Sequence, residues 1–128
     1  TPERVRHIKA TTGLPVMKAI KVADEADVAG AEPYLDAADR LLFDAKAPAD
    51  MAAALPGGNA LAFDWKLLGK RSWPIPWMLS GGLQAQNVAE AVRISGAMAV
   101  DVSSGVESAP GVKDGARIAA FLAAAKAL

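Results

Sequence analysis

The stretch Met-Leu-Ser-Gly-Gly at residues 78–82 ends an apolar run with two glycines, and Met-Ala-Val-Asp-Val-Ser-Ser-Gly at residues 98–105 ends a second run in a similar way. Each pattern predicts a buried strand that leads into a turn of small residues just before a helix. Such a turn leaves backbone N–H groups free to bind a phosphate. Two neighbouring strands with such loops at one edge of a sheet therefore predict a phosphate site.

The composition is typical of a packed globular protein. The chain has 128 residues, 52% hydrophobic and 22% charged, which suits one ordinary domain with a buried core. Fourteen basic residues balance fourteen acidic ones, so no general field attracts nucleic acid or an anionic membrane. We expect neither of these partners, and any anion should bind at a local site.

The residue types also limit the chemistry. The chain has no cysteine and a single histidine, His7, so we expect no disulfide, no thiolate nucleophile, no metal site and no cofactor. It has no hydrophobic stretch of about 18 residues and no signal-like N-terminus, which predicts a soluble cytoplasmic protein. The chain starts at Thr1 instead of methionine, which fits a processed chain or a fragment.

Helical and strand patterns alternate along the chain, starting with a helix that Thr1 and Pro2 begin and Gly13 ends. Short, apolar, β-branched runs then predict four buried strands. The strands are residues 14–22, 40–45, 75–79 and 97–102, and helices are expected over 28–37, 64–68, 88–94 and from 114 onward. The order α(βα)₄ predicts an α/β fold with a parallel sheet, because such strands are joined by helical crossovers.

Several details refine this pattern. Asn87 with Glu90 predicts a capping box for the helix over 88–94. Lys18, inside an apolar strand, favours a buried ion pair with a carboxylate. The long stretch 46–62 contains Pro-Gly-Gly-Asn at 56–59, and we interpret it as an active-site loop. The last helix is expected to bury one stripe, made of Ile118, Phe121, Leu122 and Ala125.

Several short motifs follow one another along the chain in a characteristic order and spacing. They are Leu-Phe-Asp-Ala-Lys at 42–46, Pro-Gly-Gly-Asn at 56–59, Phe-Asp-Trp at 63–65, Leu-Ser-Gly-Gly-Leu at 79–83, Asn-Val at 87–88, Val-Asp-Val-Ser-Ser-Gly-Val-Glu at 100–107, Pro-Gly at 110–111 and Lys-Asp at 113–114. Together they resemble phosphoribosylanthranilate isomerase, nearly end to end. The resemblance implies a (β/α)₈ barrel that converts N-(5-phosphoribosyl)anthranilate to 1-(2-carboxyphenylamino)-1-deoxyribulose 5-phosphate in tryptophan biosynthesis. It covers only the C-terminal half, strands five to eight, as one half-barrel domain over residues 1–128.

Asp44 lies at the end of the second predicted strand, where barrel enzymes place catalytic groups. The reaction needs an acid for the ribose ring oxygen and a base for the proton on the neighbouring carbon, and a carboxyl group with a raised pKa suits the acid. The resemblance implies that Asp44 is this general acid. The alternative is that Asp44 only caps or hydrogen-bonds the following loop.

The remaining candidates bind the substrate. Backbone amides of small residues would hold its phosphate, or these residues serve only tight turns that need positive φ. Asp101 lies in an apolar strand and must pair or face a polar cavity; a core hydrogen bond and a substrate contact are both open, and the resemblance implies the contact. The full substrate-binding set is Gly81, Gly82, Asp101, Ser103, Ser104 and Gly105.

The resemblance also implies what this chain lacks. The general base of the family is a cysteine at the end of the first strand, and early loops hold the anthranilate ring. Each acid or base group contributes about 10²-fold to 10⁴-fold in rate, so we expect the chain alone to be inactive or nearly so. Four strands cannot close a barrel, so the expected partners besides the phosphorylated sugar-anthranilate substrate are a second copy or the missing N-terminal half.

Two other functions are consistent with parts of the pattern. A non-catalytic half-barrel would bind phosphosugars or assemble with a partner without catalysis. An unrelated flavodoxin-like doubly wound domain would have a similar length. The motif at residues 98–105 argues against the flavodoxin-like domain.

Overall fold

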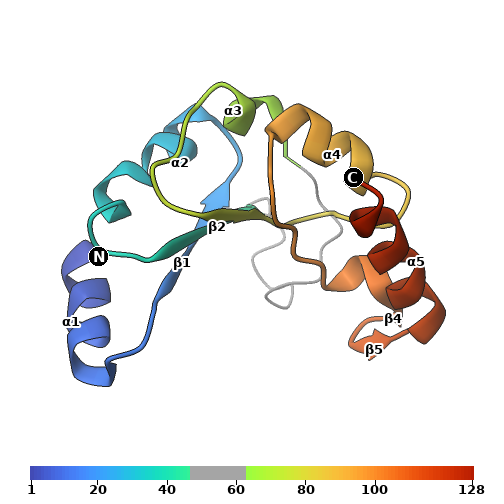
Figure 1. Ribbon diagram of the computed structural model, residues 1–128, viewed down its shortest axis with the longest axis horizontal. Coiled ribbons are helices and arrows are strands. Elements are labelled where there is room, and N and C mark those ends of the chain that lie inside the picture. Colours follow the sequence, from blue (N-terminus) through green and yellow to red (C-terminus); the bar gives the residue numbers. More distant parts are fainter. Residues whose placement is uncertain (47–62) are drawn as a thin grey trace.

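The computed structural model describes residues 1–46 and 63–128, so the predicted active-site motif at 56–59 lies outside the described residues. Three parallel strands, in the order β1-β2-β3, form an arc with helices on its outer side (Figure 1). No helix of the described part is long and apolar enough to cross a membrane. The elements are α1 (Pro2–Thr12), β1 (Met17–Val22), α2 (Glu25–Ala29), the 3₁₀ helix η1 (Glu32–Tyr34), β2 (Arg40–Ala45), α3 (Lys66–Gly69), β3 (Trp77–Leu79), α4 (Val88–Ser95), the 3₁₀ helix η3 (Ser104–Val106), β4 (Glu107–Ala109), β5 (Val112–Lys113) and α5 (Gly115–Lys126).

One face of the sheet, the covered face, is buried beneath helices. Ile20 of β1 lies opposite Phe43 of β2, which lies opposite Leu79 of β3. These side chains share one face because paired positions of a sheet point the same way, and they are 7%, 0% and 0% exposed. The helical residues in the same cluster include Val28, Leu68, Val88 and Ala91. This layer forms the main core.

The opposite side of the sheet is the open face. Its side chains alternate along each strand with those of the covered face. Met17, Ala19 and Lys21 of β1 lie on it beside Leu42 and Asp44 of β2. Met17 is 48% exposed although it is a large apolar residue within the sheet. The described residues therefore leave this face largely uncovered.

The predicted ends of the first and last helices are confirmed. The Thr1 hydroxyl accepts a hydrogen bond from the Arg4 N–H at the start of α1, and Gly13 ends the helix with φ 67°. Asp114 caps α5 through its carboxylate. Local capping chemistry is enough to define such ends.

The predicted helix over residues 28–37 is wrong in its bounds. The chain forms α2, which Asp24 caps by accepting a hydrogen bond from Asp27, and then the separate helix η1. Pro33 lies in the first turn of η1, and proline has no N–H and crowds the preceding turn of an α-helix. A continuous helix therefore cannot pass through this position without a kink.

The predicted fourth strand over residues 97–102 is also wrong. This segment meets β3 at a single parallel bridge, between Leu79 and Val100. The Leu79 N–H donates to the Ala99 carbonyl over 3.0 Å, and the Asp101 N–H donates to the Leu79 carbonyl over 2.8 Å. Because β3 is only three residues long, it offers little edge for a longer ladder. The segment nevertheless runs parallel to β3.

Two predictions about helix surfaces need correction. Asn87 precedes α4, but its side chain does not cap the helix and instead bonds to the preceding loop. In α5, Phe121 is buried as predicted, whereas Ile118 and Leu122 are 37% and 48% exposed. The main neighbours of α5 are α4 and η3, which leaves the outer part of the predicted stripe open.

Among residues 1–46 and 63–128, no carboxylate forms the ion pair predicted for Lys18. The Lys18 ammonium lies 5.0 Å from the centroid of the Tyr34 ring, a cation–π contact. This contact stabilises a cation beside the helix layer. The tryptophans Trp65, Trp73 and Trp77 pack against the core.

Candidate active site

The predicted site residues lie at one edge of the sheet. Asp44 is near the end of β2, Gly81 and Gly82 follow β3, and residues 101–105 follow the bridge to β3. We name residues 80–83 the first loop and residues 101–105 the second loop. Since the strands are parallel, all of these positions are at the carboxyl ends of strands, where barrel enzymes build their sites.

Asp44 forms an ion pair with a residue that the sequence analysis missed. The Lys21 ammonium donates to Asp44 Oδ2 over 2.5 Å, and the Asp44 side chain is 21% exposed. The two residues are register partners on β1 and β2 and both lie on the open face. The signal was the alternation within β1, which places Lys21 on the face opposite Ile20. The described partner of Asp44 is therefore a lysine of the neighbouring strand.

Gly81 brings the first loop against Asp44. Its φ is 87°, and a Cβ on it would lie 2.4 Å from the Ala45 nitrogen and 2.9 Å from Asp44 Oδ1. A side chain at this position would collide with the backbone of β2. Glycine is therefore required here for close approach as well as for its backbone angle.

The second loop packs against the first through Gly105. A Cβ on Gly105 would lie 1.8 Å from the carbonyl oxygen of Leu83, although Gly105 has no positive φ. Close backbone approach, and not turn geometry, therefore requires this glycine. The two loops that the sequence predicted to act together are in direct contact.

Asp101 joins the second loop to the end of β3. The Ser80 hydroxyl donates to Asp101 Oδ2 over 2.9 Å. Ser80 is 7% exposed, whereas Asp101 is an exposed residue. The predicted hydrogen bond exists, but Asp101 is not part of the core.

The two loops present unpaired backbone donors. Within residues 1–46 and 63–128, no group accepts a hydrogen bond from the backbone N–H of Gly81, Gly82, Ser104 or Gly105. Backbone N–H groups that are not paired within the protein are available to an anion. The arrangement thus joins a carboxyl group, Asp44, to a set of amide donors at one edge.

Sequence comparisons identify the family. The family of N-(5'phosphoribosyl)anthranilate (PRA) isomerases matches residues 3–124. The chain belongs to the PRA isomerase family. It is 65% identical over 126 residues to the isomerase of Paramagnetospirillum magneticum, covering 98% of this chain and 58% of that protein. It is 64% identical over 128 residues to the isomerase of Rhodospirillum centenum, covering 100% of this chain and 59% of that protein.

Solved PRA isomerase structures agree. The crystal structure from Thermotoga maritima matches with a TM-score of 0.79 and 36% identity, covering 100% of this chain and 58% of that one. A PRA isomerase in complex with reduced 1-(O-carboxyphenylamino)-1-deoxyribulose 5-phosphate matches with a TM-score of 0.72 and 35% identity, covering 95% of this chain and 54% of that one. The fold is therefore part of a PRA isomerase barrel, and the chain spans little more than half the length of these relatives.

A network behind the second loop was also missed by the sequence analysis. The Lys113 ammonium donates to the carbonyl and hydroxyl oxygens of Ser103 and to Glu107 Oε1. This ammonium, and next the Gly111 N–H, hold the pKa of Glu107 below its usual value. The hairpin of β4 and β5, which sequence reasoning did not predict, is what places Lys113 beside Ser103.

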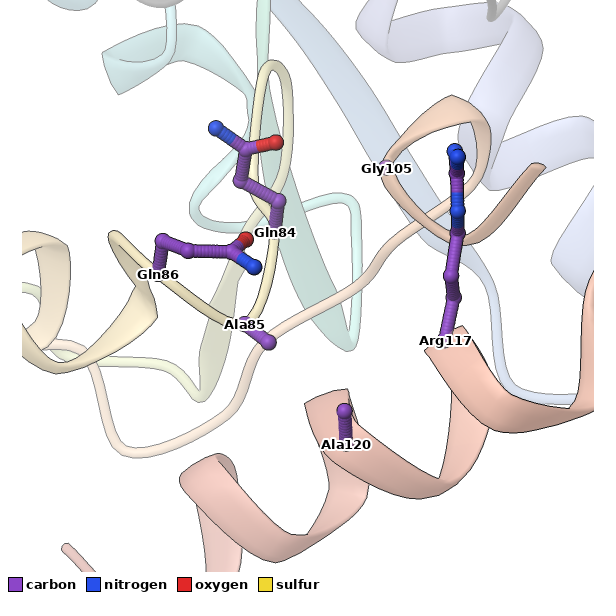
Figure 2. A pocket seen from close by; sticks show the side chains of 6 residues that line it. All are labelled: Gln84, Ala85, Gln86, Gly105, Arg117 and Ala120. Atoms are coloured by element: carbon purple, nitrogen blue, oxygen red, sulfur yellow. The ribbon is translucent and has the colours of Figure 1, made fainter. Parts of the chain in front are cut away.

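A cavity of about 320 Å³ lies between residues 84–86, Gly105 and α5. Figure 2 shows Arg117 of α5 pointing toward the loop that carries Gly105, across from Gln84 and Gln86. The Arg117 guanidinium donates to the Glu107 carbonyl. In the described part of the chain, no cluster of three His, Cys, Asp or Glu side chains could hold a metal ion.

Proposed function

We propose that this chain supplies the C-terminal half, strands five to eight, of a PRA isomerase barrel. The complete barrel would convert N-(5-phosphoribosyl)anthranilate to 1-(2-carboxyphenylamino)-1-deoxyribulose 5-phosphate in tryptophan biosynthesis. One observation carries the proposal: Gly81 lies so close to Asp44 that a Cβ would meet its carboxylate, at the edge where two adjoining loops present N–H groups that the described residues leave unpaired. A phosphosugar that opens its ring needs both an acid and an anion site.

The substrate phosphate would bind the two loops. Amide donors there would come from Gly81, Gly82, Ser104 and Gly105, with Ser103 at the base of the second loop. Backbone donors suit a phosphate because several of them can converge on its oxygens without side-chain entropy. The phosphate would thereby orient the ribose toward Asp44.

Asp44 would act as the general acid. It would donate a proton to the ribose ring oxygen while the bond from that oxygen to the anomeric carbon breaks and the nitrogen lone pair forms an iminium. The donor would be the protonated form of Asp44, and the ion pair with Lys21 would form with the carboxylate that remains after the transfer. Asp101, which Ser80 holds at the edge, would contact the substrate directly.

The base that removes the proton from the neighbouring carbon would come from the part of the relatives that this chain does not span. That part would also cover the open face, where Met17 is exposed, and the outer stripe of α5, where Leu122 is exposed. Without it, we propose that the chain is inactive. Burial of apolar surface stabilises by roughly 25 cal/mol per Å², so a second copy would occupy these surfaces when no other partner is present.

Reassembly tests this proposal. The chain would be mixed with the N-terminal part of the Paramagnetospirillum magneticum isomerase, up to the point where the alignment begins, and isomerase activity would be measured. We expect activity from the mixture and none from either part alone. A mixture without activity despite formation of a one-to-one complex, or full activity of the chain alone, would contradict it.

The alternative, a phosphosugar-binding or self-assembling half-barrel without catalysis, keeps support from the exposed apolar residues of the open face. Sedimentation equilibrium of the chain alone would distinguish the two modes of assembly. We expect a homodimer in the absence of the N-terminal part and a one-to-one complex in its presence. A homodimer that the N-terminal part cannot disrupt would favour the alternative.

A further inference from the structure

Lys113 uses two of its donors on Ser103, at the base of the second loop, and the third on Glu107. Its ammonium lies 2.9 Å from the Ser103 carbonyl oxygen, 3.1 Å from the Ser103 hydroxyl oxygen and 2.7 Å from Glu107 Oε1. An ammonium has three N–H donors, so none is left for a ligand. Lys113 is therefore placed to fix the loop, and not to touch a substrate.

The direction of a carbonyl fixes the direction of the next N–H. The structure has no cis peptide bond in its described ranges, and in a trans peptide the C=O and the following N–H point in opposite directions. Lys113, together with the Val106 N–H at 3.4 Å, holds the Ser103 carbonyl on the hairpin side. The Ser104 N–H must then point away from the hairpin.

The first loop has the same arrangement with a different side chain. Asn87 Nδ2 donates to the Gly82 carbonyl over 2.9 Å, and its Oδ1 accepts from the Gln84 N–H over 2.9 Å. The Leu83 N–H must therefore point away from Asn87. In both loops, a side chain from a later part of the chain holds one carbonyl, but the next amide belongs to Ser104 in the second loop and to the buried Leu83 in the first.

Glu107 keeps Lys113 in place. Its Oε2 accepts from the Gly111 N–H over 3.0 Å, so the carboxylate is fixed within the hairpin. The guanidinium of Arg117 donates to the Glu107 carbonyl, which ties the hairpin to α5. The hairpin thus acts as a clasp that connects the last helix to the second loop.

We propose that Lys113 is a positioning residue that turns the amide of Ser104 in the second loop toward the phosphate of the substrate, with Glu107 as the residue that orients Lys113. This inference rests on the proposed phosphate site. In this inference, the orientation of the second loop depends on a charged side chain that does not contact the ligand. The positive charge of Lys113 is balanced by Glu107, so geometry and not net charge would be its contribution.

Inorganic phosphate binding to the full ¹⁵N-labelled chain tests the inference. For the unmodified chain, we expect the amides of Gly81, Gly82, Ser104 and Gly105 to shift on titration. Lys113→Met should weaken phosphate binding about tenfold, the size of one hydrogen bond to a charged group, and Lys113→Arg should recover part of the loss. Lys126→Met, at an exposed lysine in the last turn of α5, removes the same charge and should change affinity little.

Glu107→Gln separates geometry from charge. If only electrostatic attraction matters, removing the negative charge of Glu107 strengthens phosphate binding. If Glu107 instead holds Lys113 in place, the same substitution weakens phosphate binding. We expect weaker binding. Stronger or equal binding by this variant, or equal binding by Lys113→Met, overturns the inference, as does a loss by Lys113→Met that is accompanied by collapse of amide dispersion throughout the sheet. Absence of shifts in the unmodified chain instead overturns the proposed phosphate site.

Discussion

The covered and open faces belong to the same three strands but have opposite characters. On β2, Phe43 is fully buried under the helices, while its neighbours Leu42 and Asp44 look toward the open face. The covered face supplies stability through apolar contacts. The open face and its edge carry the ion pair and the loops with free amides. Alternate residues of one strand therefore serve the stable core and the candidate site. Substitutions at neighbouring positions can test this division.

The largest expected effect is on catalysis. In the reassembled barrel, Asp44→Asn should lower kcat by about 10²-fold to 10⁴-fold, because the amide cannot donate the proton that the ring oxygen needs. The urea midpoint should change little, since the side chain has no apolar packing role. Asp36→Asn, at an aspartate away from the edge, serves as the control. Near-normal turnover by Asp44→Asn would show that another group is the acid.

The next effect is on stability. Phe43→Ala should lower the free energy of unfolding by about 3–5 kcal/mol, because Phe43 packs against Trp73 at 4.8 Å and Trp77 at 5.6 Å between ring centroids. Leu42→Ala, at the next residue on the other face, should cost about 1 kcal/mol in the chain alone. Urea unfolding measures both, and equal losses would mean that the open face is covered by a partner already present.

Two glycines sharpen the comparison at the edge of the sheet. Gly81 and Gly96 both have positive φ, at 87° and 74°, but an added Cβ would meet other backbone atoms within 4 Å at Gly81 and nothing at Gly96. Gly96→Ala should cost roughly 1–2 kcal/mol from its backbone angle alone. Gly81→Ala should cost more and should also abolish phosphate shifts in the first loop. Equal stability losses with phosphate binding intact would refute the close-approach argument.

The sequence predicted what local chemistry determines. The Thr1 cap, the glycine end of α1 and the bounds of β2 follow from short-range rules, and the position of Asp44 follows from the strand pattern. The fourth strand failed because its pairing depends on the length of β3, which no property of residues 97–102 reveals. The prediction of a buried stripe in α5 failed for a similar reason, because the burial of a helix face depends on which elements pack against it.

The candidate site shows the same division. Glycines followed by a helix indicated both loops, but the partners that orient them come from elsewhere in the chain. Asn87 looked like a cap because the sequence cannot show that its side chain turns back to Gly82. Lys21 became a partner of Asp44 only through the register of two strands. Contacts between elements therefore account for most of what the sequence analysis missed.

The smallest expected effect is the loss of stability at low pH. It involves two ion pairs, one in the hairpin of β4 and β5 and one beside the sheet. Hydrogen bonds from Lys113 and then from Gly111 hold the pKa of Glu107 below 4.5, and hydrogen bonds from Lys46 and then from Ala23 hold the pKa of Asp27 below 3.8. A depressed folded-state pKa means that the unfolded chain binds the proton first on acidification. Both contributions are therefore complete above the ordinary pKa values and disappear as the pH falls through the folded-state ones.

The lysine partners of the two carboxylates are 47% and 52% exposed, so water and salt screen both ion pairs. The loss of stability should therefore be well below that of Phe43→Ala. Urea midpoints at about pH 6 and at about pH 3 would measure it, because this interval spans the ordinary values of both groups. Glu107→Gln and Asp27→Asn should each remove part of the pH dependence.

On acidification the Gly111 amide, which donates to Glu107, should shift before amides of the covered face do. Simultaneous shifts of both sets would mean that the clasp and the sheet open as one unit.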